Sequence, residues 1–360
     1  MLLSTQRGIV VKINNRTQKR ADISVLFDGV EASAINYIDL TGDVAEGDEV
    51  ILNTTAVELK LGTGGNHFVI HNMRHQGLKQ ADAGHIMKLR YTPYQVKVMT
   101  AEEQDSPYHS IFHEFKSLRG FPVLVGTLHS MLLPIAATLK YINPDLNIAY
   151  IMTDAAALPI ALSNNVELLK EKGIIKATIT IGHAFGGDFE CINIYNGLIT
   201  AKEIAKCDLV IVTMGPGIVG TGTPFGFSGI DQGMLLDAAN DLGGMSIAVP
   251  RISFSDARER HRGISHHSLT VLSTITKTKS NIVIPKLDEV ERNYILEQIN
   301  QLQLSEKHYI VEESGDLFPD VLRFFDIEVE TMGRKFQEDK SFFLTGAATA
   351  VFANRLFNMD

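Results

Sequence analysis

Continuous runs of apolar residues alternate with helical segments from residue 120 onward, and this alternation constrains the fold more than any other feature. Runs rich in Val and Ile are typical of strands buried on both faces of a parallel sheet, with the intervening helices covering those faces. The predicted strands are residues 122–127, 148–153, 177–182, 190–195, 208–214, 245–250, 281–285 and 308–311. The sequence therefore predicts an α/β domain over 119–360, with a mostly parallel, Rossmann-like sheet and helices on both faces.

Helical segments are expected between these strands and after the last of them. The predicted helices are residues 129–141, 154–172, 200–206, 230–242, 266–279, 288–304, 317–325 and 342–357. Ligands of such sheets bind outside the carboxyl ends of the strands, so the loops that follow the strands are the first place to look for a site.

The first 75 residues have a different pattern. Short Val- and Ile-rich runs between residues 8 and 72 are separated by turn signals such as Asp28-Gly29 and Glu46-Gly47-Asp48. Regular short strands with this punctuation are typical of a small all-β barrel or sandwich, which we predict for residues 1–75. Residues 76–118 are expected to connect this domain to the α/β domain.

Bulk properties exclude several classes of protein. The net charge of -9 argues against a nucleic-acid partner, which normally requires a basic surface. No apolar run is long enough for a membrane span, and no basic and apolar leader begins the chain. Cys191 and Cys207 do not form a CxxC pair, so neither a zinc ribbon nor a disulfide framework is expected. A cytoplasmic protein follows as the expectation, and a homo-oligomer is left open.

Polar residues and glycines follow the first three predicted strands of the α/β domain. Because parallel strands end at one edge of a sheet, these side chains can converge on one cleft. The predicted substrate-binding residues of these loops are Thr127, His129, Asp154, His183, Gly186 and Gly187. Asp188, in the same region, is predicted to act catalytically, as an orienting carboxylate or as a metal ligand.

A glycine-rich loop follows strand 208–214 and supplies further predicted substrate-binding residues. They are Gly215, Gly217, Gly220, Thr221, Gly222 and Thr223. The spacing matches G-x-G-x-x-G, but the next helix begins only near residue 229, and the next strand ends near Arg251 instead of an acid. The loop is therefore a poor dinucleotide fingerprint, and no Gly-Lys-Ser/Thr follows that would make it a Walker A loop. Backbone binding of an anion and a purely structural tight loop both remain open.

A basic stretch between Asp256 and Ser268 is the second principal contributor. Arg258, Arg260 and Arg262 are predicted to bind a carboxylate or phosphate, since arginine suits both groups. The predicted catalytic residues are His261, His266, His267 and Asp256. Ser265 should cap the following helix, whose dipole would keep His266 and His267 neutral, as a general base or a metal ligand requires. A solvated basic loop with carboxylate-paired histidines is the alternative.

Cofactors remain unknown at this point. Histidines and aspartates from separate loops are suitable ligands for Zn²⁺, Mn²⁺ or Mg²⁺, but no short metal motif such as H-E-x-x-H occurs. A divalent metal and a nucleotide both stay open. No G-x-S-x-G motif supports a serine hydrolase.

Four long phrases resemble a bacterial family, mostly from Firmicutes, that is described only as a domain of unknown function. They are LFDGVEASAINYIDLTGDVAEGDEVILNTTAVELKLGTGG, GHAFGGDFE, MGPGIVGTGTPFGFSG and ISFSDARERHRGISHHS. The resemblance covers nearly the whole chain and implies a bacterial cytosolic protein, without catalytic residues to carry over.

Three functional hypotheses follow from these patterns. The leading one is an enzyme that acts on a small anionic substrate, such as a phosphorylated one, at the carboxyl edge of the sheet. The second is a non-catalytic sensor of a nucleotide or metabolite that uses the β-domain as an interaction surface. The third treats the β-domain as an oligomerisation or scaffold module.

Overall fold

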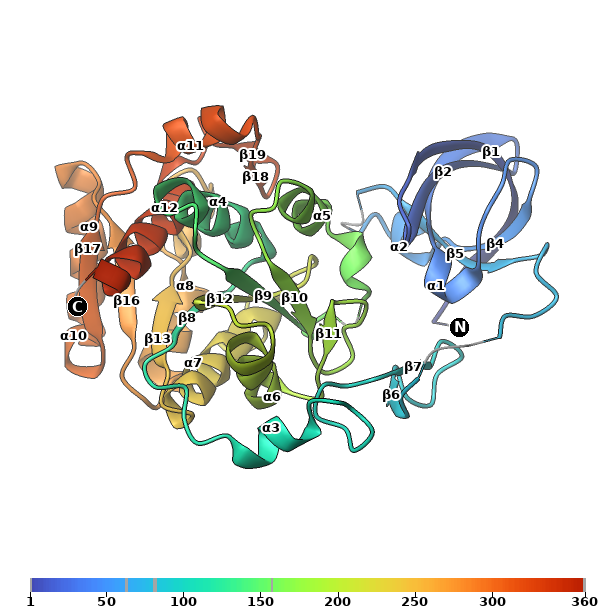
Figure 1. Ribbon diagram of the computed structural model, residues 1–360. Coiled ribbons are helices and arrows are strands. Elements are labelled where there is room, and N and C mark those ends of the chain that lie inside the picture. Colours follow the sequence, from blue (N-terminus) through green and yellow to red (C-terminus); the bar gives the residue numbers. More distant parts are fainter. Residues whose placement is uncertain (1, 62–63, 80–82, 157, 359–360) are drawn as a thin grey trace. The chain divides into compact units, whose positions relative to one another are not determined.

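The computed structural model describes residues 2–61, 64–79, 83–156 and 158–358. The chain divides into two compact units (Figure 1). The barrel unit comprises Met1–Ala83 and Tyr91–Tyr94, and the α/β unit comprises Gly84–Arg90 and Gln95–Asp360.

Five strands form a closed barrel in the order β1-β2-β3-β5-β4. Their bounds are β1 (Thr5–Arg16), β2 (Arg20–Phe27), β3 (Val30–Tyr37), β4 (Glu49–Asn53) and β5 (His67–Asn72). The pair β3–β5 is parallel and the other neighbours are antiparallel. This connectivity is that of a five-stranded OB-type barrel. The predicted all-β barrel is therefore confirmed.

The barrel core follows from alternation along its strands. In β2, Ala21, Ile23 and Val25 are buried, whereas Asp22 and Ser24 between them are half-buried. Side chains of successive strand residues point to opposite faces, so this pattern places one apolar set inside. Two short helices complete the unit, α1 (Ile38–Thr41) and α2 (Thr55–Glu58). The segment that follows forms the antiparallel pair β6 (Ile86–Lys88) and β7 (Val96–Val98), then α3 (His109–Glu114).

An eight-stranded sheet in which all paired neighbours are parallel forms the centre of the α/β unit. Its order is β11-β10-β9-β12-β8-β13-β16-β17. The strands are β8 (Pro122–Gly126), β9 (Ile148–Thr153), β10 (Ala177–Thr180), β11 (Phe189–Glu190), β12 (Leu209–Met214), β13 (Met245–Val249), β16 (Asn281–Pro285) and β17 (Tyr309–Glu313). The predicted Rossmann-like arrangement is confirmed.

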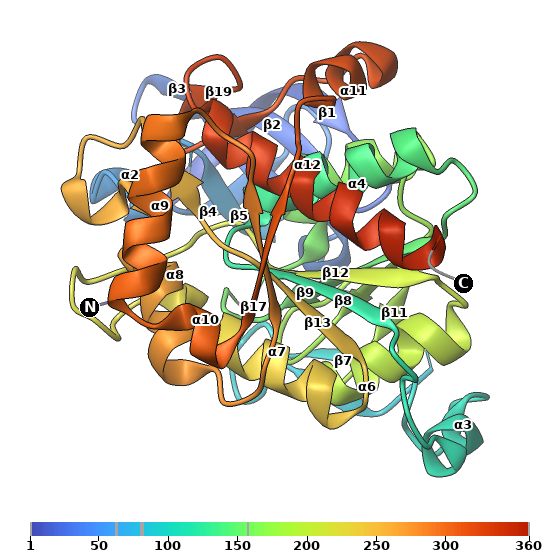
Figure 2. The same ribbon diagram turned by 90° about the vertical axis from the view of Figure 1, so that its left-hand side faces the viewer.

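Helices cover both faces of this sheet, each face with its own apolar core. One face carries α4 (Leu132–Ile142), α5 (Asn164–Glu171), α11 (Phe318–Phe325) and α12 (Lys340–Arg355). The other carries α6 (Ile194–Ile199), α7 (Gln232–Asp241), α8 (His266–Thr270), α9 (Glu289–Gln301) and α10 (Leu304–Lys307). Figure 2 shows α4 and α12 on one side of the strands and α6 and α7 on the other. None of the helices in the described part of the chain has the length and apolar character that a membrane span requires.

The connections change face in the middle of the sheet. The helices that follow β8 and β9 pack on one face, and those that follow β12 and β13 pack on the opposite face. In the sheet, β12, β8 and β13 are neighbours. Open α/β sheets bind ligands at such a switch, outside the carboxyl ends of the strands. The loops after these three strands are therefore the expected position of a ligand site.

Several predicted boundaries are wrong, and two of them have a clear physical reason. The strand expected over 190–195 ends at Glu190, because the side chain of Asn193 accepts a hydrogen bond from the backbone of Asn196 and caps a helix there. The helix expected over 154–172 begins only at Asn164, where Ser163 is the cap. Pro159 in the first half of that range disfavours a continuous helix, and residue 157 lies outside the described residues.

Candidate functional site

A pocket of 260 Å³ lies at the carboxyl ends of β8, β12 and β13. Its volume falls just below the roughly 300–1,000 Å³ that ligand pockets usually have, so it has room only for a small molecule. Its lining residues come from the loops after these strands and from one more distant turn. They are Thr127, Leu128, Ile218, Val219, Gly220, Gly222, Phe227, Arg251, Arg258, Arg260, His261, His267 and Met332. The structure thus brings the predicted glycine loop and the predicted basic stretch together.

The glycine loop folds back on itself beside the pocket. Gly220 forms a β-bridge with Phe227, and the backbone N–H of Thr221 donates to the carbonyl of Gly226 at 2.7 Å. Gly222 has a φ of 76°, a conformation that glycine adopts readily. No described residue accepts a hydrogen bond from the backbone N–H of Gly220 or Gly222. Both groups are therefore available to an oxygen atom of a ligand.

Asp256 holds two arginines at the pocket. Its Oδ2 accepts from Nη2 of Arg251 at 2.7 Å and from Nη2 of Arg258 at 2.8 Å. Arg251 is buried, with 5% of its surface exposed. The hydrogen bonds from Arg258, and then those from Arg251, hold the pKa of Asp256 well below its usual range. The structure therefore places Asp256 as an ionised counter-ion beside the pocket.

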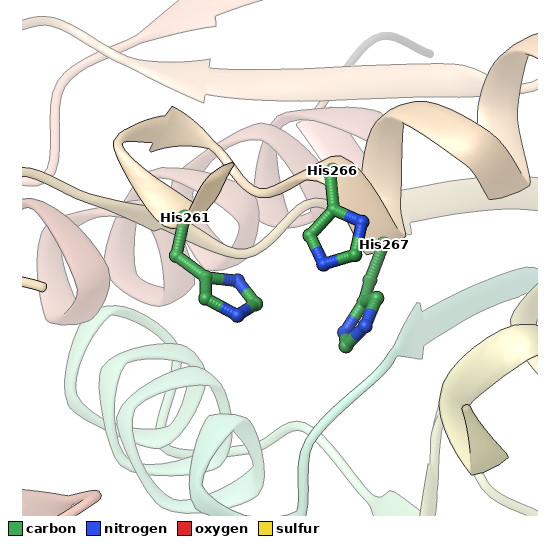
Figure 3. Close-up of side chains that lie close together, drawn as sticks. All are labelled: His261, His266 and His267. Carbon is green, nitrogen blue, oxygen red and sulfur yellow. The ribbon is translucent and has the colours of Figure 1, made fainter. Parts of the chain in front are cut away.

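Three histidine rings lie close together (Figure 3), and that of His261 is in hydrogen-bonding contact with Arg251. His261 ends a 3-10 turn (Glu259–His261), while His266 and His267 begin α8. The side chain of Ser265 caps α8 by accepting from the backbone N–H of His267, as predicted. The ring centroid of His261 lies 5.0 Å from that of His266 and 5.3 Å from that of His267. The centroids of His266 and His267 lie 4.1 Å apart. One nitrogen from each ring lies within 4.8 Å of the others, so the cluster is also a geometric candidate for a metal site.

The hydrogen bonds of His261 do not fit metal binding. Nη1 of Arg251 lies 2.8 Å from Nδ1 of His261. A guanidinium group can only donate, so Nδ1 accepts and the proton of the neutral ring resides on Nε2. Histidines that bind a metal show the opposite pattern, with the second ring nitrogen donating to an acceptor. Three neighbouring guanidinium groups also disfavour a divalent cation, and the same features favour an anion.

All three histidines are held in the neutral form. Burial, and next the charge of Arg251, lower the pKa of His261 to about 3. Burial and the neighbouring His266 lower the pKa of His267 to about 4. Burial and then Arg260 lower the pKa of His266, whose Nε2 is buried without a hydrogen-bond partner among the described residues. The ring of His267 stacks on Phe227, with the centroids 4.0 Å apart.

We expect the α/β unit to lose stability as the pH falls below about 6.5, where histidines of the unfolded chain take up protons. Folded His261 stays neutral down to a pKa of about 3, so the unfolded state binds more protons between these values. His261 alone should then lower the free energy of unfolding by up to about 1.4 kcal/mol per pH unit. Urea denaturation between pH 7.5 and 5.0 measures this slope. His261→Gln should flatten it, and an equal slope in this variant would contradict the prediction.

The remaining predicted residues do not line the pocket. In the glycine loop these are Gly215, Gly217, Thr221 and Thr223. Asp256 and His266 contact lining residues without lining the pocket themselves. The others are His129, Asp154, His183, Gly186, Gly187, Asp188 and Arg262. Arg262 lies over the rings of Phe254 and Tyr294, 5.8 and 5.6 Å from their centroids. The functional roles assigned to these residues from the sequence stay predictions.

Polar groups in the loops after β9 and β10 form hydrogen bonds with one another and with the segment Gly84–Arg90. Nδ1 of His183 accepts from the backbone N–H of Leu89 at 2.9 Å, and Oδ2 of Asp154 accepts from that of His183 at 2.9 Å. Asp188 pairs with Lys170 at 2.6 Å and accepts from the backbone N–H of Thr178. These contacts hold the two loops to each other and to Leu89, which is a structural role.

His129 also forms its hydrogen bonds away from the pocket. Its Nδ1 lies 3.1 Å from the hydroxyl of Tyr150 and its Nε2 lies 2.6 Å from that of Ser163. Burial lowers its pKa to about 4. Its neutral ring therefore joins the loop after β8 to the cap of α5.

Several lining residues were not among the predicted site residues, and of these Arg251 and Met332 matter most. Arg251 directly follows the strand expected over 245–250, and that position was the signal that could have identified it. Met332 carried no comparable signal, because it lies far along the sequence from the loops of the sheet edge, in a turn that follows none of the predicted strands directly.

Comparison with known proteins adds a family but no activity. Among curated proteins, no sequence matches the chain. One family model, described as "Protein of unknown function (DUF3866)", matches residues 33–350 and so spans both units of the structure. The domain of unknown function indicated by the sequence phrases is thereby confirmed, and the chain belongs to the DUF3866 family.

Proposed function

We propose that the pocket binds a small anionic, phosphate-bearing ligand and that the protein is an enzyme acting on it. One observation carries this proposal. Three arginines, Arg251, Arg258 and Arg260, line a pocket of 260 Å³, while Asp256 is the one carboxylate that pairs with any of them among the described residues. The charge excess favours an anion, and the planar, multi-donor guanidinium group suits phosphate oxygens.

Arg260 is the first candidate for direct contact with the anion. It is exposed at the pocket and forms no ion pair with any described residue. Arg258 keeps half of its side chain exposed while it pairs with Asp256. Further donors are the backbone N–H groups of Gly220 and Gly222. His261 adds its Nε2–H, because its Nδ1 accepts from Arg251 and the ring proton therefore resides on Nε2. Charged and neutral donors thus surround one small space.

His267 is the candidate for acid–base chemistry. It lines the pocket, and its low pKa leaves the ring nitrogens neutral at physiological pH. An anion bound beside it would stabilise its protonated form, so the ring can accept a proton while the ligand is present. A non-catalytic sensor would need the same anion contacts without this proton transfer.

Calorimetric titration with inorganic phosphate and a set of phosphate monoesters tests the anion site. Removing one charged hydrogen bond costs about 1.5–3 kcal/mol, so Arg260→Met should raise Kd roughly 10- to 150-fold. Arg323→Met is the control, because Arg323 is an exposed arginine paired with Asp320 outside the pocket. Absence of binding by every phosphate compound, or an unchanged Kd in Arg260→Met, would contradict the proposal.

Turnover separates the enzyme from the sensor. His267→Phe keeps an aromatic ring that can stack on Phe227 but removes both ring nitrogens. We expect this variant to bind the ligand and to fail to convert it. If the wild-type protein binds a phosphate compound but converts none of those bound, the sensor is the better description.

We further propose a bacterial and cytoplasmic setting, in which the small anion, rather than a nucleic acid, is the partner. The resemblance of the four sequence phrases supports the bacterial assignment. Cys191 and Cys207 are both buried and unpaired, as is usual in a reducing compartment.

A further inference from the structure

The pocket has two chemically different sides. The arginines and histidines after β13 form the polar side. The other side is apolar and consists of Leu128, Ile218, Val219, Phe227 and Met332. Leu128 and Phe227 are buried, but Val219 is 66% exposed and Met332 is 49% exposed. Large apolar side chains exposed together at a pocket commonly mark a binding surface.

Met332 occupies a backbone position that does not suit methionine. It forms, with Gly333, the two-residue turn between β18 (Glu330–Thr331) and β19 (Arg334–Lys335). The φ values of Met332 and Gly333 are 49° and 75°, as in a type I′ turn, whose first position favours Asn, Asp or Gly. A methionine is unfavourable there, and its exposed side chain gains little from core packing. Unfavourable backbone positions of this kind concentrate at ligand-binding sites.

Polar contacts on both sides fix the turn that carries Met332. The hydroxyl of Thr331 lies 3.0 Å from that of Ser130, which follows β8. Nε of Arg334 donates to Oδ2 of the fully buried Asp339 at 2.9 Å. The methionine side chain is therefore held at the pocket by its neighbours and does not itself hold the turn in place.

We infer that the ligand carries an apolar group next to its anion, and that this group packs against Met332, Ile218 and Val219. The inference rests on the proposed function, since the anion places the ligand in the pocket. The glycine loop contributes to both sides, with Gly220 and Gly222 beside the anion and Ile218 and Val219 beside the apolar group. The substrate class is thus a small phosphate ester with an aromatic or branched apolar body.

Three probes separate the two parts of the ligand. Inorganic phosphate tests the anion alone, phenyl phosphate adds an apolar body, and glycerol 3-phosphate adds a polar body. We expect phenyl phosphate to bind about tenfold more tightly than glycerol 3-phosphate. At 25 cal/mol per Å², a tenfold difference corresponds to burial of about 55 Å² of apolar surface, which a phenyl ring readily provides.

Two substitutions of Met332 make the test specific. Met332→Asn removes the apolar side chain and creates an Asn-Gly turn, which a type I′ hairpin favours, so folding should not suffer. We expect this variant to lose the preference for phenyl phosphate while its Kd for inorganic phosphate stays unchanged. Met332→Leu keeps an apolar side chain and should keep the preference.

Calorimetric titration of the full chain with the three probes decides the outcome. Equal binding of phenyl phosphate and glycerol 3-phosphate by the wild-type protein overturns the inference but leaves the anion site intact, provided that inorganic phosphate binds. A preference that survives unchanged in Met332→Asn also overturns it. Failure of all three probes to bind overturns the proposed function itself.

Discussion

Replacing Asp256 by alanine should lower the free energy of unfolding of the α/β unit by about 3–5 kcal/mol, the cost typical of leaving a buried charge unpaired. The side chains of Arg251 and Asp256 are 6% and 4% exposed and are joined at 2.7 Å. Without the carboxylate, the guanidinium group of Arg251 retains only the neutral ring of His261 as a side-chain hydrogen-bond partner among the described residues. With 6% of the Arg251 side chain exposed, water at the pocket can replace the lost carboxylate only in part.

Denaturation by urea, followed through the transition of the α/β unit, measures this effect. Glu328→Ala is the matched control, since it removes a carboxylate from a surface pair with Lys335, also close at 2.8 Å but 83% and 63% exposed. Exposed pairs contribute about 0–1 kcal/mol. In the double variant Arg251→Met/Asp256→Ala both charges are gone, so part of the stability should return. A loss below about 1 kcal/mol for Asp256→Ala would mean that Arg251 is not in fact desolvated.

The fold was largely predictable because its strongest determinants are local. Apolar runs such as Leu209–Met214 are buried along their whole length, which identifies strands covered on both faces without knowledge of their neighbours. Whether these strands form a barrel or a sandwich could not be predicted from the local sequence. It depends on the parallel pairing of Ala34 in β3 with His67 in β5, and strand alternation looks the same in both architectures.

The candidate site was predictable only in part, for a related reason. The loops around Gly220 and His261 meet because parallel strands end at one edge of the sheet and because β12 and β13 flank β8. The loop containing His183 and Asp188 follows β10, which lies beyond β9 on the far side of β12 from the pocket. Sequence order does not reveal spatial strand order, so residues at the same edge could not be sorted into near and distant ones.

The hydrogen-bond partners of the loop after β10 could not be predicted from the sequence either, and Lys88 is the clearest example. Its ammonium group donates to the carbonyls of Thr180 and Ala184 at 3.1 and 2.6 Å and pairs with Glu190 at 2.6 Å. Lys88 precedes the sheet by a long stretch of chain, and no sequence pattern links it to these acceptors. The polar groups after β10 therefore form hydrogen bonds with the segment Gly84–Arg90 of the α/β unit.

Lys88→Met should destabilise the α/β unit by about 3–5 kcal/mol, as expected when one partner of a buried ion pair is removed. Lys88 is 1% exposed and Glu190 is 9% exposed. After the substitution, the carboxylate of Glu190 keeps the hydroxyl of Thr180 and the backbone N–H of Gly186 as its partners in the described part of the chain, and the two carbonyls lose a charged donor. The segment Gly84–Arg90 loses its anchor at the same time, so proteolytic cleavage within it should become faster.

Urea denaturation and limited proteolysis of the full chain test both consequences. Lys335→Met removes a lysine from the exposed pair with Glu328 and should change stability by no more than about 1 kcal/mol. In Lys88→Met/Glu190→Gln no buried charge is left unpaired, so stability should partly recover while cleavage of the segment stays fast, since its ionic anchor is still missing. Equal stabilities of Lys88→Met and Lys335→Met would show that the buried pair contributes no more than a surface one. A resistant segment in Lys88→Met would show that its other contacts, such as that of Leu89 with His183, hold it unaided.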